Sequence, residues 1–235
     1  MNPKREIRVQ TIVVSLLVSI MTILLLGILL SFQPLSASLG SELLAINQTT
    51  TQSANAVTSV VTYFRGLDTL GEVTILFLSI FGIGLGIERL QEKENIFSYD
   101  NALLKIGADI LFPLIILFGF YIIIHGHLSP GGGFQGGVVI ASAFLLMFLA
   151  KNNELKLNHK ITTLVEALSG AGFVLVGILG LLLVDRFLGN FLPLGTLGKL
   201  WSGGVIPLIY IFVGLKVSAE ISTLVEYFIR IKDAR

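Results

Sequence analysis

The sequence predicts an all-α polytopic membrane protein with six transmembrane helices and both termini in the cytoplasm. Composition is the first of three observations behind this prediction. Of the 235 residues, 54% are hydrophobic and 13% are charged, and the mean hydropathy is +0.87. Soluble domains carry about 25% charged residues, so this chain has few side chains suited to facing water.

The second observation is a series of six apolar segments. An apolar helix needs about 20 residues to cross the hydrocarbon core of a bilayer. The first segment follows basic residues, as a signal peptide would, but its apolar run exceeds the ~7–15 residues of a signal-peptide core. We therefore expect a retained helix. The predicted spans are Ile12–Phe32, Leu70–Ile87, Ile106–Ile124, Gly133–Leu149, Ile161–Val184 and Val205–Leu224.

The third observation is the distribution of Lys and Arg, which are enriched in cytoplasmic loops of membrane proteins. With the N-terminus inside, thirteen of the sixteen Lys and Arg residues fall on the cytoplasmic side. The three on the outer side are Arg65, Arg186 and Lys199. An odd number of spans would scramble this bias, so we expect six crossings and two cytoplasmic termini.

The spans form two groups, separated by the polar segment Glu88–Asn101. We expect a two-helix membrane module at residues 1–95 and a four-helix membrane domain at residues 102–232. The connection Gln33–Tyr63 is rich in Ser, Thr, Asn and Gln, and we expect it to be solvated on the outer side.

Composition also argues against several classes of function. The net charge of +1 gives no basic field for binding nucleic acid. The chain has no Cys for thiolate chemistry or Fe–S ligation, and its three His argue against a multi-His metal or haem centre. We expect no nucleic-acid partner, no metal, no cofactor and no enzymatic activity of its own.

Charged side chains inside membrane spans are costly and are therefore candidates for function. The strongest cluster lies at the outer end of the second span, where Arg65, Asp68 and Glu72 share one face if the segment is helical. Two acids near one cation are suited to binding a proton or Na⁺. The alternative is an interfacial ion pair that ends the helix, with Asp68 near an N-cap position. The spacing fits both interpretations.

Glu166 lies about one turn into the fifth span and is a candidate for a proton relay or for a contact with a neighbouring subunit. Four other charged residues are expected near inner helix ends, where they extend to the interface or meet partner loops. Of these, Lys216 and Glu220 have the spacing at which two charges neutralise each other on a helix. The four are Asp109, Lys216, Glu220 and Glu226.

The most unusual stretch, residues 127–137, joins the third and fourth spans on the outer side. Pro and Gly cost about 3 and 1 kcal/mol relative to Ala in a helix, so we expect a break. Irregular backbone at membrane depth is buried in protein or lines a hydrated cavity, and His127 titrates in a range suited to a proton carrier. The alternative is close helix packing by G-x-x-x-G pairs, with His127 capping a helix. The other residues of interest are Pro130, Gly131, Gly132, Gly133, Phe134, Gly136 and Gly137.

This stretch, His-Leu-Ser-Pro-Gly-Gly-Gly-Phe-Gln-Gly-Gly, resembles the signature of the B subunit (MnhB/MrpB type) of Mrp multisubunit Na⁺/H⁺ antiporters. The four-helix part, about Ile106–Ile229, is similar to that subunit in span number and in the outer position of the motif. By this resemblance His127, Pro130 and Phe134 occupy the motif positions that shape the region of the ion path.

A second resemblance covers the first module. The segment Tyr63–Glu72, Tyr-Phe-Arg-Gly-Leu-Asp-Thr-Leu-Gly-Glu, is similar to an MbhE-like segment that normally ends the large A subunit. Residues 1–95 thus resemble that two-helix tail, fused here to a B subunit, which implies that the partner A-like subunit lacks the tail. The resemblance implies that Glu72 is the acidic residue of the ion path, with Asp68 and Arg65 as its neighbours.

Together the resemblances imply a non-catalytic subunit of a complex that exchanges cytoplasmic Na⁺ for external H⁺ in a prokaryotic inner (plasma) membrane. The implied partners are A-, C-, D-, E-, F- and G-like antiporter subunits, Na⁺, H⁺ and lipid. Two alternatives remain open. One is an ion-translocating subunit of a group 4 membrane-bound hydrogenase or a related respiratory complex, and the other is a purely structural assembly subunit.

Overall fold

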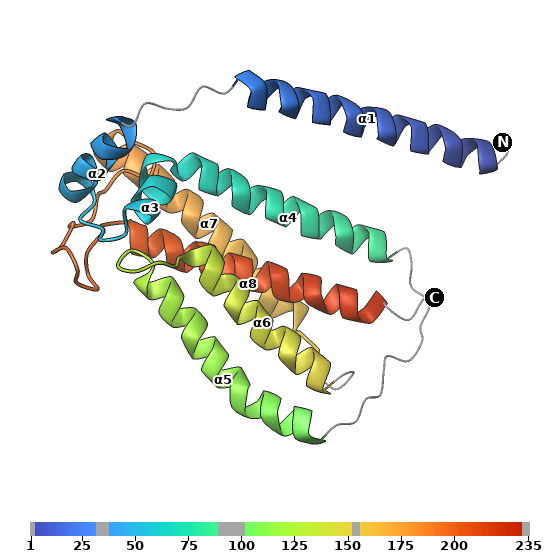
Figure 1. Cartoon of the computed structure of the whole chain (residues 1–235). Helices are drawn as coiled ribbons and strands as arrows, with labels where there is room; N and C mark the ends of the chain where they lie inside the picture. The colour runs from blue at the N-terminus through green and yellow to red at the C-terminus, as the bar shows by residue number, and fades with distance from the viewer. Residues whose placement is uncertain (1–2, 32–37, 89–101, 152–155, 232–235) are drawn as a thin grey trace. The chain divides into compact units, whose positions relative to one another are not determined.

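The computed structural model describes residues 3–31, 38–88, 102–151 and 156–231, and this part of the chain forms helices and no strand. The chain divides into two units, Met1–Glu42 and Leu43–Arg235. Figure 1 labels the helices. They are α1 (Pro3–Ser31), α2 (Ser38–Thr50), α3 (Ala56–Ser59), the π-helix η1 (Val60–Phe64), α4 (Gly66–Glu88), α5 (Ala102–His125), α6 (Gly133–Lys151), α7 (His159–Val184) and α8 (Ile206–Ile231).

Five of the six predicted spans correspond to helices that are long and apolar enough to cross a membrane. These are Gly66–Gly86, Ala102–His125, Gly133–Lys151, His159–Val184 and Ile206–Ile229. The first predicted span corresponds to α1, whose apolar helix Ser15–Gly27 is shorter; its last residue, Phe32, lies outside the described residues. The all-α polytopic membrane fold is therefore confirmed.

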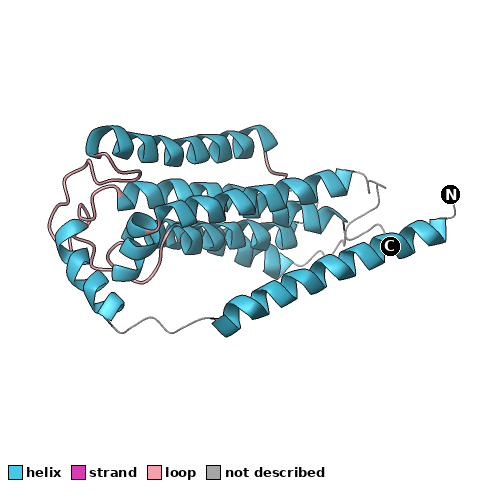
Figure 2. Ribbon diagram, turned by 90° about the horizontal axis from the view of Figure 1, so that it is seen from above, coloured by secondary structure: helices cyan, strands magenta, loops and turns pink. Residues whose placement is uncertain are grey.

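In the second unit, α8 is the central helix and packs against α4, α5, α6 and α7. The long helices of this unit run side by side (Figure 2). Small residues let α6 approach two neighbours closely, because a Cβ atom at Gly137 would lie 2.8 Å from the carbonyl oxygen of Gly214 in α8. A Cβ atom at Gly136 would lie 2.7 Å from the carbonyl oxygen of Gly119 in α5. Bare glycine backbone thus sets the spacing of these helices.

The prediction of a solvated outer connection is wrong for part of the described residues 38–63, although most described side chains of α2 are exposed. These residues form α2, α3 and η1, and several of their polar side chains are buried. The Thr51 hydroxyl donates to Oδ1 of Asn47 at 2.6 Å and lies 2.8 Å from the Ser59 hydroxyl. Buried polar groups must be hydrogen-bonded, and these side chains satisfy one another, which polarity along the sequence does not reveal.

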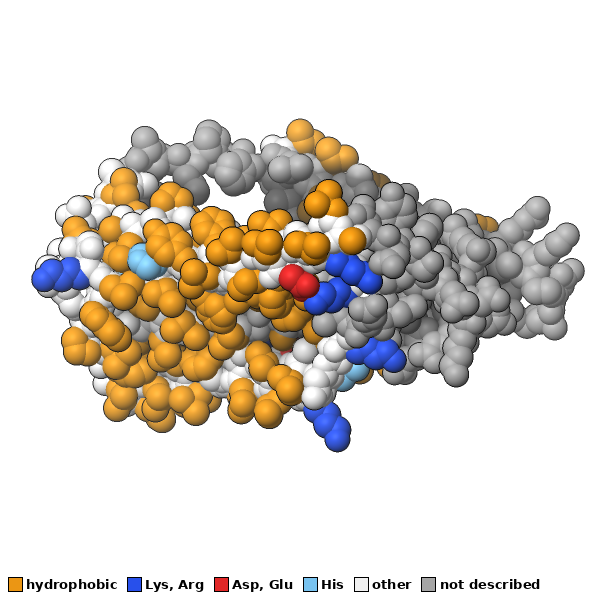
Figure 3. Space-filling model, turned by 90° about the horizontal axis from the view of Figure 1, so that it is seen from below, with side chains coloured by type: hydrophobic (Ala, Val, Ile, Leu, Met, Phe, Trp, Pro, Cys, Tyr) orange, Lys and Arg blue, Asp and Glu red, His pale blue; other side chains and the backbone are white. Residues whose placement is uncertain are grey.

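The surface has the pattern expected of a membrane protein. Hydrophobic side chains cover most of the coloured part of the face drawn in Figure 3, and the few charged side chains visible there lie at the borders of this coloured part. Large exposed apolar side chains are frequent on α4 and α5, including Leu78 at 58% and Leu117 at 69% exposure. Apolar surface on this scale is stable only against lipid or partner chains.

The second unit has two ends that are used as reference points below. At the His127 end, α4 begins and the connection 126–132 joins α5 to α6. At the opposite, His159 end, α5 and α7 begin and α4, α6 and α8 finish.

Candidate functional site

A charged cluster lies in the middle of α8. Nζ of Lys216 lies 2.7 Å from Oε1 of Glu220 and 4.0 Å from Oε1 of Glu166, which projects from α7. Lys216 is about 15 Å along a 26-residue helix, so the expectation that Lys216 and Glu220 lie near an inner helix end is wrong. Their side chains are 11% and 1% exposed. The predicted mutual neutralisation of this pair is present, but deep inside the span.

The surroundings of Lys216 accommodate its charge. The ammonium group lies 4.9 Å from the ring centroid of Phe77 on α4, a distance at which a ring face attracts a cation. Gly170 on α7 lies beside the Lys216 side chain, where a Cβ atom would be in ordinary contact at 3.6 Å from Nζ. Three helices thus contribute contacts to one cation: α4 the Phe77 ring, α7 the Glu166 carboxylate and α8 the Glu220 carboxylate.

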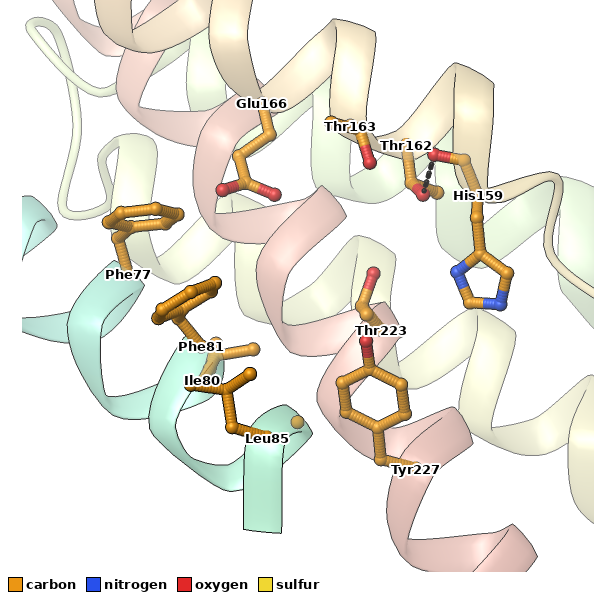
Figure 4. A pocket seen from close by; sticks show the side chains of 11 residues that line it. Phe77, Ile80, Phe81, Leu85, His159, Thr162, Thr163, Glu166, Thr223 and Tyr227 are labelled. Carbon is orange, nitrogen blue, oxygen red and sulfur yellow. Dashed lines mark hydrogen bonds between the residues drawn. The ribbon is translucent and has the colours of Figure 1, made fainter. Parts of the chain in front are cut away.

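A cavity of about 360 Å³ lies between α4, α7 and α8, beside this cluster. In Figure 4 the Glu166 carboxylate points into it from α7, facing the rings of Phe77 and Phe81 on α4. One wall is apolar and the other carries hydroxyl, imidazole and carboxylate groups. The lining residues are Phe77, Ile80, Phe81, Gly84, Leu85, His159, Thr162, Thr163, Glu166, Thr223 and Tyr227.

Further ion pairs lie at the His159 end. Nζ of Lys151 on α6 lies 2.6 Å from Oδ1 of Asp109 on α5. Glu226 is buried on α8, where its Oε1 accepts from the backbone N–H of Leu157 at 3.4 Å and its Oε2 lies 3.6 Å from Nε2 of His159. Asp109 and Glu226 therefore tie helix ends together, and their predicted position near helix ends is confirmed.

The predicted break between the third and fourth spans is present as the connection 126–132 between α5 and α6. It is held by Asn55 and Thr58, which belong to the segment predicted to be a solvated connection. The Asn55 amide donates to the carbonyl oxygens of Gly126 and Ser129 at 3.1 and 2.9 Å, and its Oδ1 caps α3 by accepting from the N–H of Thr58. The Thr58 hydroxyl also donates to the carbonyl oxygen of Gly126 at 2.7 Å.

The His127 side chain is fully buried at this end. Its backbone carbonyl accepts from the Ser53 hydroxyl at 2.8 Å and from the N–H of Asn55 at 3.0 Å. Its two ring nitrogens have no hydrogen-bond partner among the residues that the structure describes. Burial lowers the pKa of His127 below its ordinary value of 6.5, although the nearby backbone of Lys199 and Leu200 opposes the shift.

The other residues of the motif serve different contacts. Pro130 is exposed, and Phe134 packs against the main hydrophobic cluster of the unit. Gly133 lies against α8, where a Cβ atom would come within 2.8 Å of the carbonyl oxygen of Tyr210. Gly132 also lies close to the Tyr210 ring. The connection is therefore packed tightly on α8 through its glycines.

Arg65, Asp68 and Glu72 do not form one compact cluster. Arg65 precedes α4, and its guanidinium pairs with the Asp68 carboxylate across an exposed surface. Glu72, one turn further along α4, is exposed, and no hydrogen bond or ion pair joins it to another described residue. The interfacial ion pair of Arg65 and Asp68 is thus present, while Glu72 stands apart and faces outward from the unit.

The structure does not bring all the predicted site residues together. Glu166 belongs to the charged cluster of Lys216 and Glu220, whereas His127 lies at the His127 end, and no contact links His127 to Glu72 in the described part of the chain. Among described residues, no group of three or more His, Asp or Glu side chains is arranged to hold a metal ion.

Two features of the site were missed from sequence. One is Asn55 and its neighbours, for which the spacing Asn55–Thr58 is a helix-capping signal. The other is Asn190, whose amide donates to the carbonyl oxygen of Thr50 and whose Oδ1 accepts from the N–H of Val205, both at 3.0 Å. No sequence pattern marks Asn190, because its partners are 140 and 15 residues away.

Comparisons with known proteins agree with this fold. Residues 103–223 match the family described as a domain related to the MnhB subunit of Na⁺/H⁺ antiporter. An uncharacterized protein of Methanocaldococcus jannaschii is 31% identical over 195 residues, which are 72% of this chain and 74% of that protein. A Staphylococcus saprophyticus protein named antiporter subunit mnhB2 is 51% identical over 58 residues, 25% of this chain and 38% of that protein. The match thus spans well under half of the staphylococcal relative.

Two solved structures are similar over most of the chain. One is a chain of the membrane-bound sulfane sulfur reductase (MBS), an archaeal respiratory membrane complex, with 37% identity and a TM-score of 0.75 over 92% of this chain and 99% of that chain. The other belongs to the Mrp complex from Dietzia sp. DQ12-45-1b, with 24% identity and a TM-score of 0.64 over 95% of this chain and 26% of that chain. The latter likeness concerns the fold alone. The family match covers more than half of the sequence, and the chain belongs to the family of membrane proteins related to the MnhB subunit of Na⁺/H⁺ antiporters.

Proposed function

We propose that this chain is a non-catalytic membrane subunit of a multisubunit cation/proton antiporter, in which it helps to form the path for Na⁺ and H⁺. The observation that carries this proposal is the buried ion pair of Lys216 and Glu220 in the middle of α8, with Glu166 of α7 beside it. A charge at the centre of a membrane helix costs about 2.5–3.5 kcal/mol on insertion scales. Such residues mark ion and proton pathways because a purely structural helix has no use for them.

The second part of the proposed path is at the His127 end. Glu72 is an exposed carboxylate nearly two turns inside a spanning helix, which suits a site completed by a neighbouring subunit. Arg65 and Asp68 would hold the surface beside it, and His127 with its glycine-rich connection would shape the adjoining region. These roles rest on the resemblance of residues 63–72 and 127–137 to antiporter subunits.

The proposal also includes which end of the unit faces the cytoplasm and how the chain divides into two modules. The His159 end would face the cytoplasm, since the described basic side chains of Lys105, Lys151, Lys156 and Lys160 lie there. Lys216 lies inside α8, so it no longer counts toward this bias. Residues 1–95 and 102–232 would act as MbhE-like and MnhB-like modules in a prokaryotic plasma membrane.

The proposed partners are A-, C-, D-, E-, F- and G-like antiporter subunits. A second candidate function is an ion-translocating subunit of a respiratory membrane complex, which is favoured by one observation. The matched chain of the MBS complex is aligned over 99% of its length at 37% identity. That likeness also shows that a single polypeptide of this extent occurs in such a complex.

Mass spectrometry of the complex that co-purifies with a tagged chain separates these two functions. Large antiporter-like subunits without metal-cluster proteins would support a stand-alone antiporter. Iron–sulfur or nickel–iron subunits in stoichiometric amount would make the chain part of a redox-driven complex. In either case the chain would lie in the membrane arm, and its charged cluster would serve ion movement.

Transport by inverted membrane vesicles tests the path itself. We expect Glu166→Gln and Glu72→Gln each to lower Na⁺-dependent proton release at least tenfold while the complex stays assembled. Glu42→Gln, at an exposed position of α2, is the matched control and should leave transport unchanged. Unchanged pH and Na⁺ dependence in the assembled variants would contradict the path, and loss of assembly would favour a structural subunit.

A further inference from the structure

The cavity between α4, α7 and α8 has a shape and lining that the proposed function alone does not require. Its apolar wall comes from α4, and its polar wall carries three threonine hydroxyls, the Tyr227 hydroxyl, His159 and Glu166. His159 and Tyr227 lie toward the His159 end, near the start of α7 and the finish of α8. The polar wall therefore runs from that end of the unit into the membrane interior.

Glu166 lies at the end of this wall that is farthest from His159. It is seven residues beyond His159, which corresponds to about 10 Å along α7. Phe77, the deepest lining residue of α4, lies opposite, and the Lys216 ammonium lies over its ring. The cavity thus ends against the charged cluster, with the Glu166 carboxylate 20% exposed and the Glu220 carboxylate 1% exposed.

We propose that this cavity is a water-filled vestibule, open toward the His159 end, and that Glu166 is the proton-binding group at its inner limit. The inference rests on the proposed function and adds to it the route of entry and the group that receives the proton. Water is the natural occupant, because a cavity of this size with several polar partners holds ordered water.

The charged and titratable groups that face Glu166 come from two helices. They are Lys216 and Glu220 on α8, and further toward the His159 end His159 on α7 and Glu226 with Tyr227 on α8. On α4, the segment 73–86 carries no ionisable side chain. Lys216 is therefore the single cation that the described residues place beside both carboxylates of the cluster.

The two distances from Lys216 explain how a proton would act there. In this structure the ammonium is nearer to Glu220 than to Glu166, at 2.7 and 4.0 Å. A proton that arrives through the vestibule water as hydronium and binds the Glu166 carboxylate leaves a neutral water and a neutral side chain, and Lys216 then pairs with Glu220 alone. When the proton leaves, the Glu166 carboxylate competes again for the ammonium group.

The site suits a proton better than a metal cation. A metal ion at Glu166 would lie beside the Lys216 ammonium and would be repelled by it. Nor do the described residues gather three carboxylate or imidazole groups at this point.

The absence of cysteine from the chain allows a direct test of hydration. Thr162→Cys and Thr223→Cys, each in the whole complex, are exposed to a membrane-impermeant thiol reagent in inverted and in right-side-out vesicles. Leu164→Cys and Leu168→Cys, on the exposed apolar face of α7, are the controls at similar depth. We expect at least tenfold faster labelling of the two cavity positions than of the controls, from the His159 side alone.

Labelling no faster than at Leu164 and Leu168, or equal from both sides, would overturn the vestibule. Because this readout needs no transport, it separates failure of the vestibule from failure of the proposed function. Proton binding is tested by dicyclohexylcarbodiimide, which modifies protonated carboxyl groups. We expect modification of Glu166 to increase as the pH falls and to disappear in Glu166→Gln. Protection by Na⁺ would instead identify a metal-cation site and overturn the assignment to a proton.

Discussion

Nζ of Lys216 lies 2.7 Å from Oε1 of Glu220, on the same face of a helix and in the middle of a predicted membrane span. The pair is enclosed by α4, α7 and α8 and is nearly inaccessible to solvent. Two opposite charges of this kind stabilise each other against the cost of leaving water, but neither is tolerated alone.

Removal of one partner should therefore destabilise the protein strongly. We expect Lys216→Met to lower the free energy of unfolding by about 3–5 kcal/mol, because it leaves the buried Glu220 carboxylate unpaired. The double variant Lys216→Met/Glu220→Gln should recover most of that loss. Thermal unfolding of the purified complex measures both effects, and equal instability of the single and double variants would contradict the pairing.

The connection 126–132 should depend on Asn55. The change Asn55→Ala removes two bonds to the carbonyls of Gly126 and Ser129 and one helix cap, at about 1 kcal/mol each. Hydrogen–deuterium exchange of the peptide that covers residues 126–132 should become faster. Asn158→Ala, which removes the N-cap of α7 alone, is the control and should leave exchange in that peptide unchanged.

Helix packing should tolerate a methyl group at one glycine and not at another. At Gly137 a Cβ atom would lie 2.8 Å from the backbone of Gly214, while at Gly107 it would meet nothing within 4 Å. We expect Gly137→Ala to destabilise the fold by about 1–3 kcal/mol through overpacking. Gly107→Ala should be neutral. Comparable unfolding temperatures for the two variants would show that α6 and α8 are less closely packed than the structure indicates.

Stability should fall in mild acid because of His127. Burial holds the pKa of His127 below its unfolded value of 6.5, so the unfolded chain binds more protons between the two pKa values. This contribution to stability is therefore complete above about pH 6.5 and declines as the pH falls toward the folded pKa, by at most about 1.4 kcal/mol per pH unit. Unfolding temperatures between pH 5 and 8 should show a smaller slope for His127→Gln. Identical slopes in the wild-type protein and the His127→Gln variant would refute the assignment.

The membrane fold was predictable because hydrophobic length and Lys/Arg distribution are local properties. Five helices lie close to the expected spans, and the break after His125 follows from the chemistry of Pro130 and its neighbouring glycines. The prediction that the connection before α4 is solvated failed at its buried residues for an equally clear reason. Thr51 and Asn55 are polar residues that find buried partners, and composition does not distinguish a satisfied polar side chain from a solvated one.

The charged cluster of the candidate site was likewise predictable only in part. The sequence alone determined that Glu166, Lys216 and Glu220 are charged residues in apolar helices, and that Lys216 and Glu220 share a helical face. Only the tertiary structure decided that Glu166 joins them, that Phe77 covers the ammonium group and that a cavity reaches this point. Spacing along one helix is fixed by its 3.6-residue period, whereas contact between helices depends on how their glycines and side chains pack.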